Sequence, residues 1–256
     1  MTIPYLGAES LKLIKIAYQK AASRIIFIDY DGTLIPFSTF PEQAVMNEKA
    51  ENIITILTKD KKNKIVIISG RNKEFLDRQF AKVNVTLVAE HGFFIKEPQK
   101  AWETHVAVEL DWKQKVLPIL NKYIDSCSGS LLEEKYASLA WHYRNVNADF
   151  AKLQINQLKA DMLEILKNNA NLQILEGNKV IEIKSMAYNK GTAASEFMHQ
   201  QHFDFAMAIG DDKTDEDLFR AMPPHAHTIK IGPGLSIARY NLKKQQQLYD
   251  LFHNLL

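Results

Sequence analysis

The sequence contains one cysteine in 256 residues, and Cys127 alone excludes an internal disulfide and a thiolate metal cluster. It also lacks a strong charge of either sign. Its 32 Lys and Arg residues against 30 Asp and Glu residues leave a formal net charge of +2. We therefore expect neither nucleic acid nor a membrane as a partner. No apolar run approaches the roughly 18 residues that a membrane span needs.

The first 24 residues also lack the uninterrupted apolar segment of a signal peptide. They include Glu9, Lys12 and Lys15, and their pattern predicts an amphipathic helix. Together with the scarcity of cysteine, this predicts a protein of the reducing cytoplasm.

What is present is an alternation of apolar strands with helical patterns. Continuous apolar runs of this kind are typical of strands buried on both faces of a parallel sheet. The predicted strands are 24–28, 64–69, 85–90, 205–212 and 227–232, and the predicted helices are 47–60, 72–83, 189–202, 214–222 and 236–256. Successive βαβ units predict an α/β fold with a doubly wound parallel sheet.

The pattern changes between these two blocks. A helix is predicted over 110–125, two strands over 130–146, a long helix over 148–169 and a hairpin over 172–185. This order is typical of an antiparallel α+β layer. We therefore predict a catalytic core of residues 1–100 and 184–256, interrupted by an inserted domain of residues 101–183.

Polar residues follow the ends of four predicted core strands. In an open α/β sheet, ligands bind beyond the carboxyl ends of the strands. The residues gathered at this edge are Asp29 and Asp31; Ser69, Gly70 and Arg71; Glu90, His91 and Gly92; and Asp211, Asp212, Asp215 and Glu216. One Asp-Gly turn after a strand would be unremarkable, but four polar strand ends predict a functional site.

The spacing of Asp29 and Asp31 suggests a division of roles. Two neighbouring carboxylates repel unless a cation or a proton lies between them. One aspartate can attack phosphorus, and the other can move the proton. Asp29 and Asp211, with Asp212 or Asp215, form an oxygen-rich set suited to Mg²⁺. Ser69 lies at a strand-to-helix junction, where a hydroxyl and helix amides can hold phosphate.

Four motifs of the chain, in order, resemble those of the haloacid dehalogenase superfamily of phosphatases. They are "DYDGT", "IISGR", Lys190 and "GDDKTDE". The resemblance implies that Asp29 is the nucleophile, Asp31 the general acid/base, and Lys190 the cation that neutralises the phosphate. It further implies phosphate binding by Thr33, Ser69, Gly70 and Arg71, Mg²⁺ binding by Asp29, Asp31, Asp211 and Asp212, and a supporting role for Asp215.

Within that superfamily, the inserted domain resembles the αββαββ cap of the second cap class. The segments "AEHGF", "EEKYASLAWHYRN" and "GNKVIEIKS" resemble those of the trehalose-6-phosphate phosphatases. The resemblance implies substrate binding by Glu90, His91, Glu133, Lys135, His142, Arg144, Asn178 and Glu182. Either Asn178 or Lys179 could reach the sugar. We also expect functional coupling to a trehalose-6-phosphate synthase, and a monomer.

Several alternatives remain open at this stage. The chain could act on another sugar phosphate, such as sucrose 6-phosphate or mannosylglycerate phosphate. It could be a phosphosugar mutase related to phosphomannomutases, which share a similar core and cap. It could also be a non-catalytic sugar-phosphate-binding domain, although the presence of Asp29, Asp31, Lys190 and Asp211 argues against this. The charged cap residues could be an ordinary exposed sheet face.

Overall fold

The structure is a computed structural model that describes residues 3–38, 43–104 and 106–256. It divides into two compact units. The core unit comprises Met1–His105 and Tyr188–Leu256, and the inserted unit comprises Val106–Ala187. From the sequence, the first boundary was predicted five residues earlier and the second four residues earlier. The second boundary falls later in part because the last strand of the inserted unit continues to Ser185.

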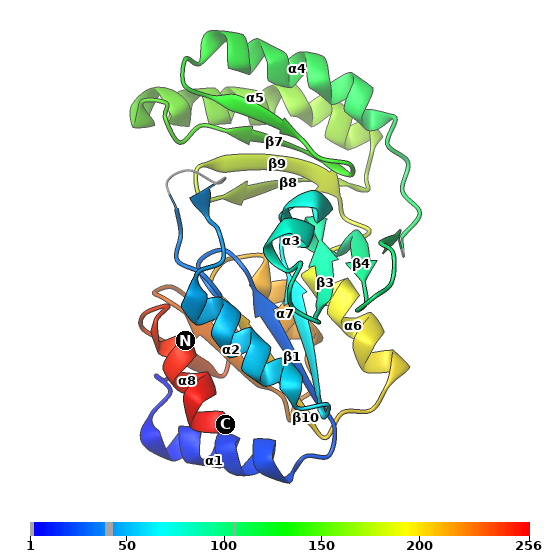
Figure 1. Cartoon of the computed structure of the whole chain (residues 1–256). Helices are drawn as coiled ribbons and strands as arrows, with labels where there is room; N and C mark the ends of the chain where they lie inside the picture. The colour runs from blue at the N-terminus through cyan, green and yellow to red at the C-terminus, as the bar shows by residue number, and fades with distance from the viewer. Residues whose placement is uncertain (1–2, 39–42, 105) are drawn as a thin grey trace. The chain divides into compact units, whose positions relative to one another are not determined.

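An eight-stranded sheet forms the core unit (Figure 1), in the order β12-β11-β10-β1-β2-β3-β4-β5. The strands from β12 to β3 are parallel, which confirms the predicted doubly wound sheet. β4 and β5 pair antiparallel at one edge. The strands are β1 (Arg24–Asp29), β2 (Asn63–Ile68), β3 (Thr86–Ala89), β4 (Phe94–Lys96), β5 (Glu103–Thr104), β10 (Phe205–Gly210), β11 (His227–Ile231) and β12 (Tyr240–Leu242).

Alternating side chains of the central strands face two different helix layers. Ile25 and Phe27 of β1 belong to one apolar cluster with Ala194 and Phe197 of α6 (Lys190–Gln200) and Leu218 of α7 (Asp215–Ala221). All six residues of β1 are buried, because helices cover both faces of the strand.

The remaining core helices pack among themselves and against the sheet. They are α1 (Ala8–Lys20), α2 (Glu48–Lys59), α3 (Lys73–Gln79) and α8 (Gln247–Leu255). α8 contacts both α1 and α2, so helices from the two ends of the chain lie side by side (Figure 1). The amphipathic helix expected near the N-terminus is thus confirmed as α1.

The inserted unit has the predicted αββαββ order. It comprises α4 (Trp112–Ser126), β6 (Leu131–Glu134), β7 (Ser138–His142), α5 (Ala148–Asn168), β8 (Leu172–Gly177) and β9 (Val180–Ser185). Its antiparallel sheet has the order β6-β7-β9-β8. One sheet face packs against both helices through a cluster that includes Leu120, Trp141, Leu158 and Ile183 (Figure 1). None of the helices described for either unit combines the length and apolarity needed to cross a membrane.

Two features of the core unit differ from the prediction. The final helix was predicted to begin at 236, which is wrong: Tyr240–Leu242 forms strand β12, and helix α8 begins at Gln247. The free edge of β11 is available to this segment, and ladder hydrogen bonds override its helical pattern. In addition, β4 and β5 were not predicted, because they are too short for their alternation to be distinctive.

The packing of the inserted unit yields a matched pair of substitutions in α5. Leu158 is fully buried, whereas Leu153 of the same helix is 66% exposed. Leu158→Ala should lower the free energy of unfolding of this unit by about 2–5 kcal/mol, because it removes core contacts and leaves a cavity. Leu153→Ala should change it by less than about 0.5 kcal/mol. Chemical denaturation followed by fluorescence of Trp141 measures both, and equal effects would contradict the described packing.

Candidate active site

The Asp-Tyr-Asp sequence at the end of β1 places its central residue away from the acids. Tyr30 is fully buried, packs edge-on against Phe75 and Phe80, and donates a hydrogen bond to the Ala44 carbonyl at 2.9 Å. Asp29, on the opposite side of the strand, bonds to the helix α6 residue Lys190. Successive residues of an extended chain point to opposite faces, so an anchored Tyr30 turns Asp29 toward α6.

Lys190 links two buried carboxylates. Its Nζ lies 2.6 Å from Asp29 Oδ1 and 2.8 Å from Asp215 Oδ1. Burial alone would lower the pKa of Lys190, but the charges of Asp215 and Asp29 raise it well above its usual value. These two acids therefore favour the charged form of Lys190 at the start of α6. Asparagine 189 caps this helix, accepting a hydrogen bond from the Thr192 amide at 2.9 Å.

Asp215 is fully occupied by hydrogen bonds. Its Oδ1 accepts from Lys190, and its Oδ2 accepts from the backbone amides of Asp211 and Asp212 at 3.0 and 3.1 Å. A Cβ at Gly210 would lie 2.1 Å from Asp215 Cγ, so only glycine allows this close approach. These contacts agree with the supporting role predicted for Asp215.

Asp211 completes the acidic group. One carboxylate oxygen each from Asp29, Asp211 and Asp215 lies within 4.8 Å of the others. Thr33 Oγ1 donates to Asp211 Oδ1 at 3.1 Å. Gly32 has a φ of +81°, and a Cβ there would lie 2.5 Å from Asp211 Oδ2, so the loop after β1 needs glycine at this point.

The group carries more negative than positive charge. Burial, and then the neighbouring acids Asp215 and Asp212, raise the pKa of Asp211 to about 7. Burial raises the pKa of Asp29 well above its usual value, with Asp211 adding to the shift and Lys190 opposing it. Three carboxylates against the single ammonium of Lys190 leave an excess of two negative charges when all are ionised. That excess equals the charge of one divalent cation.

Asp212, expected among the metal ligands, lies outside this group of three. Its Oδ1 accepts hydrogen bonds from the amide and the hydroxyl of Thr214, at 2.8 and 2.6 Å. Asp212 therefore shapes the turn into α7, and its role as a metal ligand stays a prediction.

Asp31 is held by an arginine. Arg71 donates from Nε and Nη2 to the two carboxylate oxygens, at 2.7 and 2.6 Å. Such a bidentate pair fixes the plane of the carboxylate as well as its position. Arg71 was predicted to bind phosphate together with Ser69. The buried Ser69 hydroxyl accepts from the Arg71 amide at 3.1 Å, which shapes the turn after β2.

The "EHG" segment forms a strained turn beside these residues. Glu90 and His91 have φ values of 47° and 59°, unusual for residues with a side chain. A Cβ at Gly70 would lie 2.5 Å from His91 Nε2, and one at Gly92 would lie 2.7 Å from the Asn189 carbonyl. The turn therefore packs closely against both the segment after β2 and the start of α6.

In the inserted unit, the predicted substrate-binding residues form ion pairs on the sheet face opposite α4 and α5. Lys135 Nζ lies 3.0 Å from Glu182 Oε1, which also accepts from the Ser138 hydroxyl at 2.5 Å. His142 Nε2 lies 2.9 Å from Glu133 Oε2. Burial would raise the pKa of Glu133, but His142 and Lys135 outweigh it and lower the pKa.

Arg144 and Asn178 also lie together. The Arg144 guanidinium donates to the backbone carbonyl of Asn178 at 2.8 Å. Trp141 and Tyr143, which alternate with His142 and Arg144 along the chain, belong to the apolar cluster on the helix side. The two aromatic residues of this segment therefore face the helices of the unit.

Two supporting residues were missed by the sequence reasoning. Ser138 contacts Glu182 only through the strand pairing of β7 with β9, for which the sequence carried no signal. Lys230 of β11 is buried and donates from Nζ to the Asp211 carbonyl. It could have been found, because a lysine near the end of the apolar run "HTIKIG" lies at the same sheet edge as the acids.

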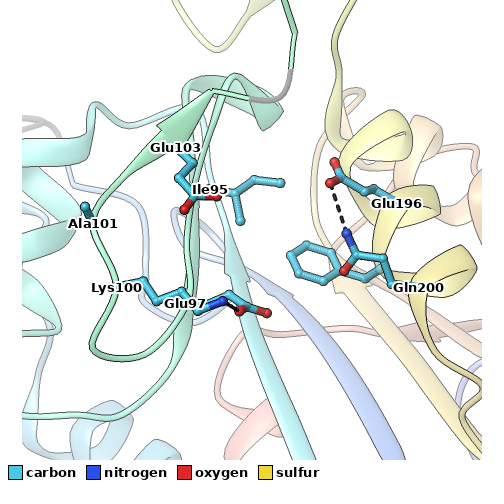
Figure 2. A pocket seen from close by; sticks show the side chains of 8 residues that line it. Ile95, Glu97, Lys100, Ala101, Glu103, Glu196 and Gln200 are labelled. Carbon is cyan, nitrogen blue, oxygen red and sulfur yellow. Dashed lines mark hydrogen bonds and ion pairs between the residues drawn. The ribbon is translucent and has the colours of Figure 1, made fainter.

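A hollow of the core unit, away from the acids, has a volume of about 170 Å³ (Figure 2). It is lined by residues of β4, the following loop and α6. Its charged groups pair with one another. Glu97 binds Lys64 and Lys100 at 2.9 and 2.6 Å, and Gln200 donates to Glu196. Gln200 lies ten residues beyond Lys190 on α6, or ~15 Å along the helix. This hollow does not include the acidic group.

Comparison with known proteins agrees with this geometry. The sequence profile of the trehalose-phosphatase family matches residues 27–251. The chain is 35% identical over 251 residues to the bifunctional trehalose-6-phosphate synthase/phosphatase of Thermoproteus tenax, covering 98% of this chain and 34% of that protein. The chain thus spans about a third of the length of this curated relative.

Solved structures show the same likeness. The C-terminal domain of a trehalose-6-phosphate phosphatase from C. albicans superposes with a TM-score of 0.92 at 28% identity, covering 99% of this chain and 98% of that one. A haloacid dehalogenase-like hydrolase from B. subtilis, 13% identical, shares the fold with a TM-score of 0.65, covering 91% of this chain and 99% of that one. The chain has a haloacid dehalogenase-like fold and belongs to the trehalose-phosphatase family.

Proposed function

We propose that this chain hydrolyses trehalose 6-phosphate to trehalose and inorganic phosphate. The observation that carries the proposal is the buried Asp29 carboxylate, held 2.6 Å from the Lys190 ammonium in a chain that belongs to the trehalose-phosphatase family. A buried, fixed carboxylate beside a cation is suited to attack the phosphorus of an anionic ester.

In the first step, an Asp29 carboxylate oxygen attacks phosphorus. A new P–O bond forms to Asp29 as the P–O bond to the sugar breaks, giving an aspartyl phosphate and releasing the sugar oxygen, which receives a proton as it leaves. Lys190 bonds to Asp29 and offsets part of the charge that gathers on the transferred group. The Thr33 hydroxyl and Ser69 lie at the same sheet edge and are available to bind phosphoryl oxygens.

Asp31 supplies and recovers the proton. It protonates the sugar oxygen as the P–O bond breaks, so that trehalose leaves as a neutral alcohol. Asp31 then takes a proton from water, which attacks phosphorus and breaks the acyl phosphate bond to Asp29. Phosphate leaves and Asp29 is regenerated. The bidentate pair with Arg71 sets the orientation of the Asp31 carboxylate.

The acidic group fits Mg²⁺. Its ligands would be carboxylate oxygens of Asp29 and Asp211, with the Asp31 carbonyl, whereas Asp215 is taken up by Lys190 and two amides. Oxygen-only donors and an excess of two negative charges favour a hard divalent cation over softer metals. When bound, Mg²⁺ neutralises charge on the phosphoryl group during transfer.

We propose that the polar face of the inserted unit selects the sugar. It carries the Lys135–Glu182 and Glu133–His142 pairs and Arg144, which can exchange their mutual hydrogen bonds for bonds to sugar hydroxyls. Sites with such groups discriminate strongly, because a ligand lacking the hydroxyls leaves buried polar groups unpaired. Glu90 and His91 in the core unit are proposed to assist.

The supply of substrate also follows from the proposal. A synthase that forms trehalose 6-phosphate must act before this phosphatase, and the Thermoproteus tenax relative is named as both synthase and phosphatase. We therefore propose functional coupling to such a synthase. The location in the cytoplasm and the monomeric state remain predictions from the sequence.

The test of this function is phosphate release from a panel of sugar phosphates. Trehalose 6-phosphate should be hydrolysed best, EDTA should stop the reaction, and added Mg²⁺ should restore it, because the acidic group needs a divalent counter-charge. Sucrose 6-phosphate and mannosylglycerate phosphate test the other sugar phosphatases, and phosphomannose interconversion tests the mutase alternative. Equal rates on all the esters would remove the claim of trehalose specificity. Full activity after chelation would contradict the proposed requirement for Mg²⁺.

The nucleophile can be tested by an isosteric change. Asp29→Asn should reduce turnover by about 10⁴-fold or more, because it removes the attacking charge. Lys190 keeps its contact with Asp215, so the fold should be retained. Asp250→Asn, on the exposed face of α8, is the matched control and should match wild type. A rate for Asp29→Asn near that of wild type would exclude the covalent mechanism.

The specificity residues can be tested with two substrates. Lys135→Ala should reduce kcat/KM for trehalose 6-phosphate by about 10- to 100-fold, the scale of losing a charged hydrogen bond. Hydrolysis of p-nitrophenyl phosphate, which lacks the sugar hydroxyls, should change little. The control Lys167→Ala removes an exposed lysine of the same unit and should affect neither substrate. A parallel loss on both substrates would assign Lys135 to the fold or the core site instead.

A further inference from the structure

A buried glutamine lies behind the loop that follows β1. Gln245, in the turn that leads into α8, donates from Nε2 to the carbonyls of Thr33 and Leu34 at 3.0 and 2.9 Å. Tyr249 of α8 donates from its hydroxyl to the same Leu34 carbonyl at 2.7 Å. The Gln245 residue is 9% exposed. Two side chains from the C-terminal end of the chain thus hold two consecutive carbonyls of this loop.

The orientation of the Gln245 amide is determined by its surroundings. Both close neighbours of Nε2 are carbonyl oxygens, so a flipped amide would place oxygen against oxygen. Gln245 Oε1 is buried and has no hydrogen-bond partner among the residues the structure describes. A buried acceptor without a partner is destabilising. Gln245 keeps this one unpaired acceptor while its Nε2 supplies donors to two buried carbonyls, so its contacts are directed at the backbone of the loop.

The loop that Gln245 holds carries part of the proposed active site. Thr33, whose carbonyl accepts from Gln245, donates from its own hydroxyl to Asp211 Oδ1 at 3.1 Å. Asp211, the acceptor of this hydrogen bond, is held in turn by Lys230, which donates to the Asp211 backbone carbonyl. The backbones on both sides of the Thr33–Asp211 hydrogen bond are therefore anchored by buried side chains from residues 230–249.

The neighbouring residues show that this arrangement is specific to one position. Gln245, Gln246 and Gln247 are consecutive, but the last two are exposed. Gln247 accepts a hydrogen bond from the Lys244 amide, and Gln246 makes no side-chain cap contact with α8. Gln246 therefore offers a control of the same residue type, one position away, with no contact to the loop.

We propose that Gln245 is a positioning residue of this site, with Tyr249 as its partner. It sets the backbone of Thr33 so that the hydroxyl, which donates to Asp211 Oδ1 here, can turn its single O–H to the phosphoryl group during transfer. The proposal rests on the proposed phosphatase function and extends it to residues that never touch substrate. Small displacements of groups that act on the reacting atoms lower kcat strongly, whereas binding of the sugar by other residues is unaffected.

Gln245→Leu removes both donated bonds and keeps the approximate size of the side chain. We expect kcat for phosphate release to fall by about 10- to 100-fold with KM within about twofold of wild type. Gln246→Leu should leave both constants unchanged. Should Gln245→Leu fail to fold, Tyr249→Phe removes a single donor and should lower kcat by about fivefold, the scale of one neutral hydrogen bond.

A double-mutant cycle separates positioning from general stability. In a Thr33→Val background the hydroxyl that Gln245 positions is absent, so Gln245→Leu should then lower kcat by less than about threefold. If Gln245 acts through stability alone, Gln245→Leu should lower the apparent activity by the same factor in both backgrounds. The melting temperature should then fall, and kcat calculated per folded molecule should equal that of wild type. Either of those results would overturn the proposal.

The outcomes also distinguish this proposal from the proposed function. If wild type is inactive on trehalose 6-phosphate but active on another phosphomonoester, the substrate is wrong, and the cycle is measured on that ester, because Gln245 contacts only the core unit. If wild type hydrolyses no phosphomonoester, the proposed function fails and the positioning proposal fails with it. If wild type is active and Gln245→Leu and Tyr249→Phe both match it, the positioning proposal alone fails.

Discussion

The active-site region depends on one buried ammonium. Lys190 lies between Asp29 and Asp215, and without it three carboxylates would share a buried site with no positive charge among them. The desolvation of such a group would exceed any packing gain. Asp215 in turn accepts from the amides of Asp211 and Asp212, so the position of the whole loop after β10 follows from this ion pair.

Lys190 also leaves part of the negative charge of these acids uncompensated. The ammonium of Lys190 binds two of the acids but does not neutralise all of them. Burial, and then the charges of Asp215 and Asp212, raise the pKa of Asp211 to about 7. This arrangement supports the proposal that the acids bind a divalent cation, which would help to neutralise a phosphate ester. The excess of negative charge destabilises the acidic group when no cation is bound. The same excess is what would attract a cation that binds a phosphate ester.

The core and inserted units use charge differently. In the core unit, the acids converge on a small volume around Lys190. In the inserted unit, polar groups pair with each other: Lys135 forms an ion pair with Glu182, and His142 forms a hydrogen bond with Glu133. The first arrangement is suited to chemistry that any phosphomonoester could undergo. The second is suited to recognition, because paired groups can exchange partners with hydroxyls while no net charge accumulates.

The sequence by itself determined the alternation of the parallel core strands up to β11 with their helices, the αββαββ insertion, and the edge at which Asp29, Asp31, Ser69 and Asp211 meet. Those features follow from local periodicity and from the rule that parallel strands deliver their carboxyl ends to one edge. The tertiary structure alone decided which groups touch. It paired Arg71 with Asp31, placed Gln245 against the carbonyls of Thr33 and Leu34, and turned residues 240–242 into a strand. These contacts join residues up to 212 positions apart, or depend on an open sheet edge, and neither leaves a trace in local pattern.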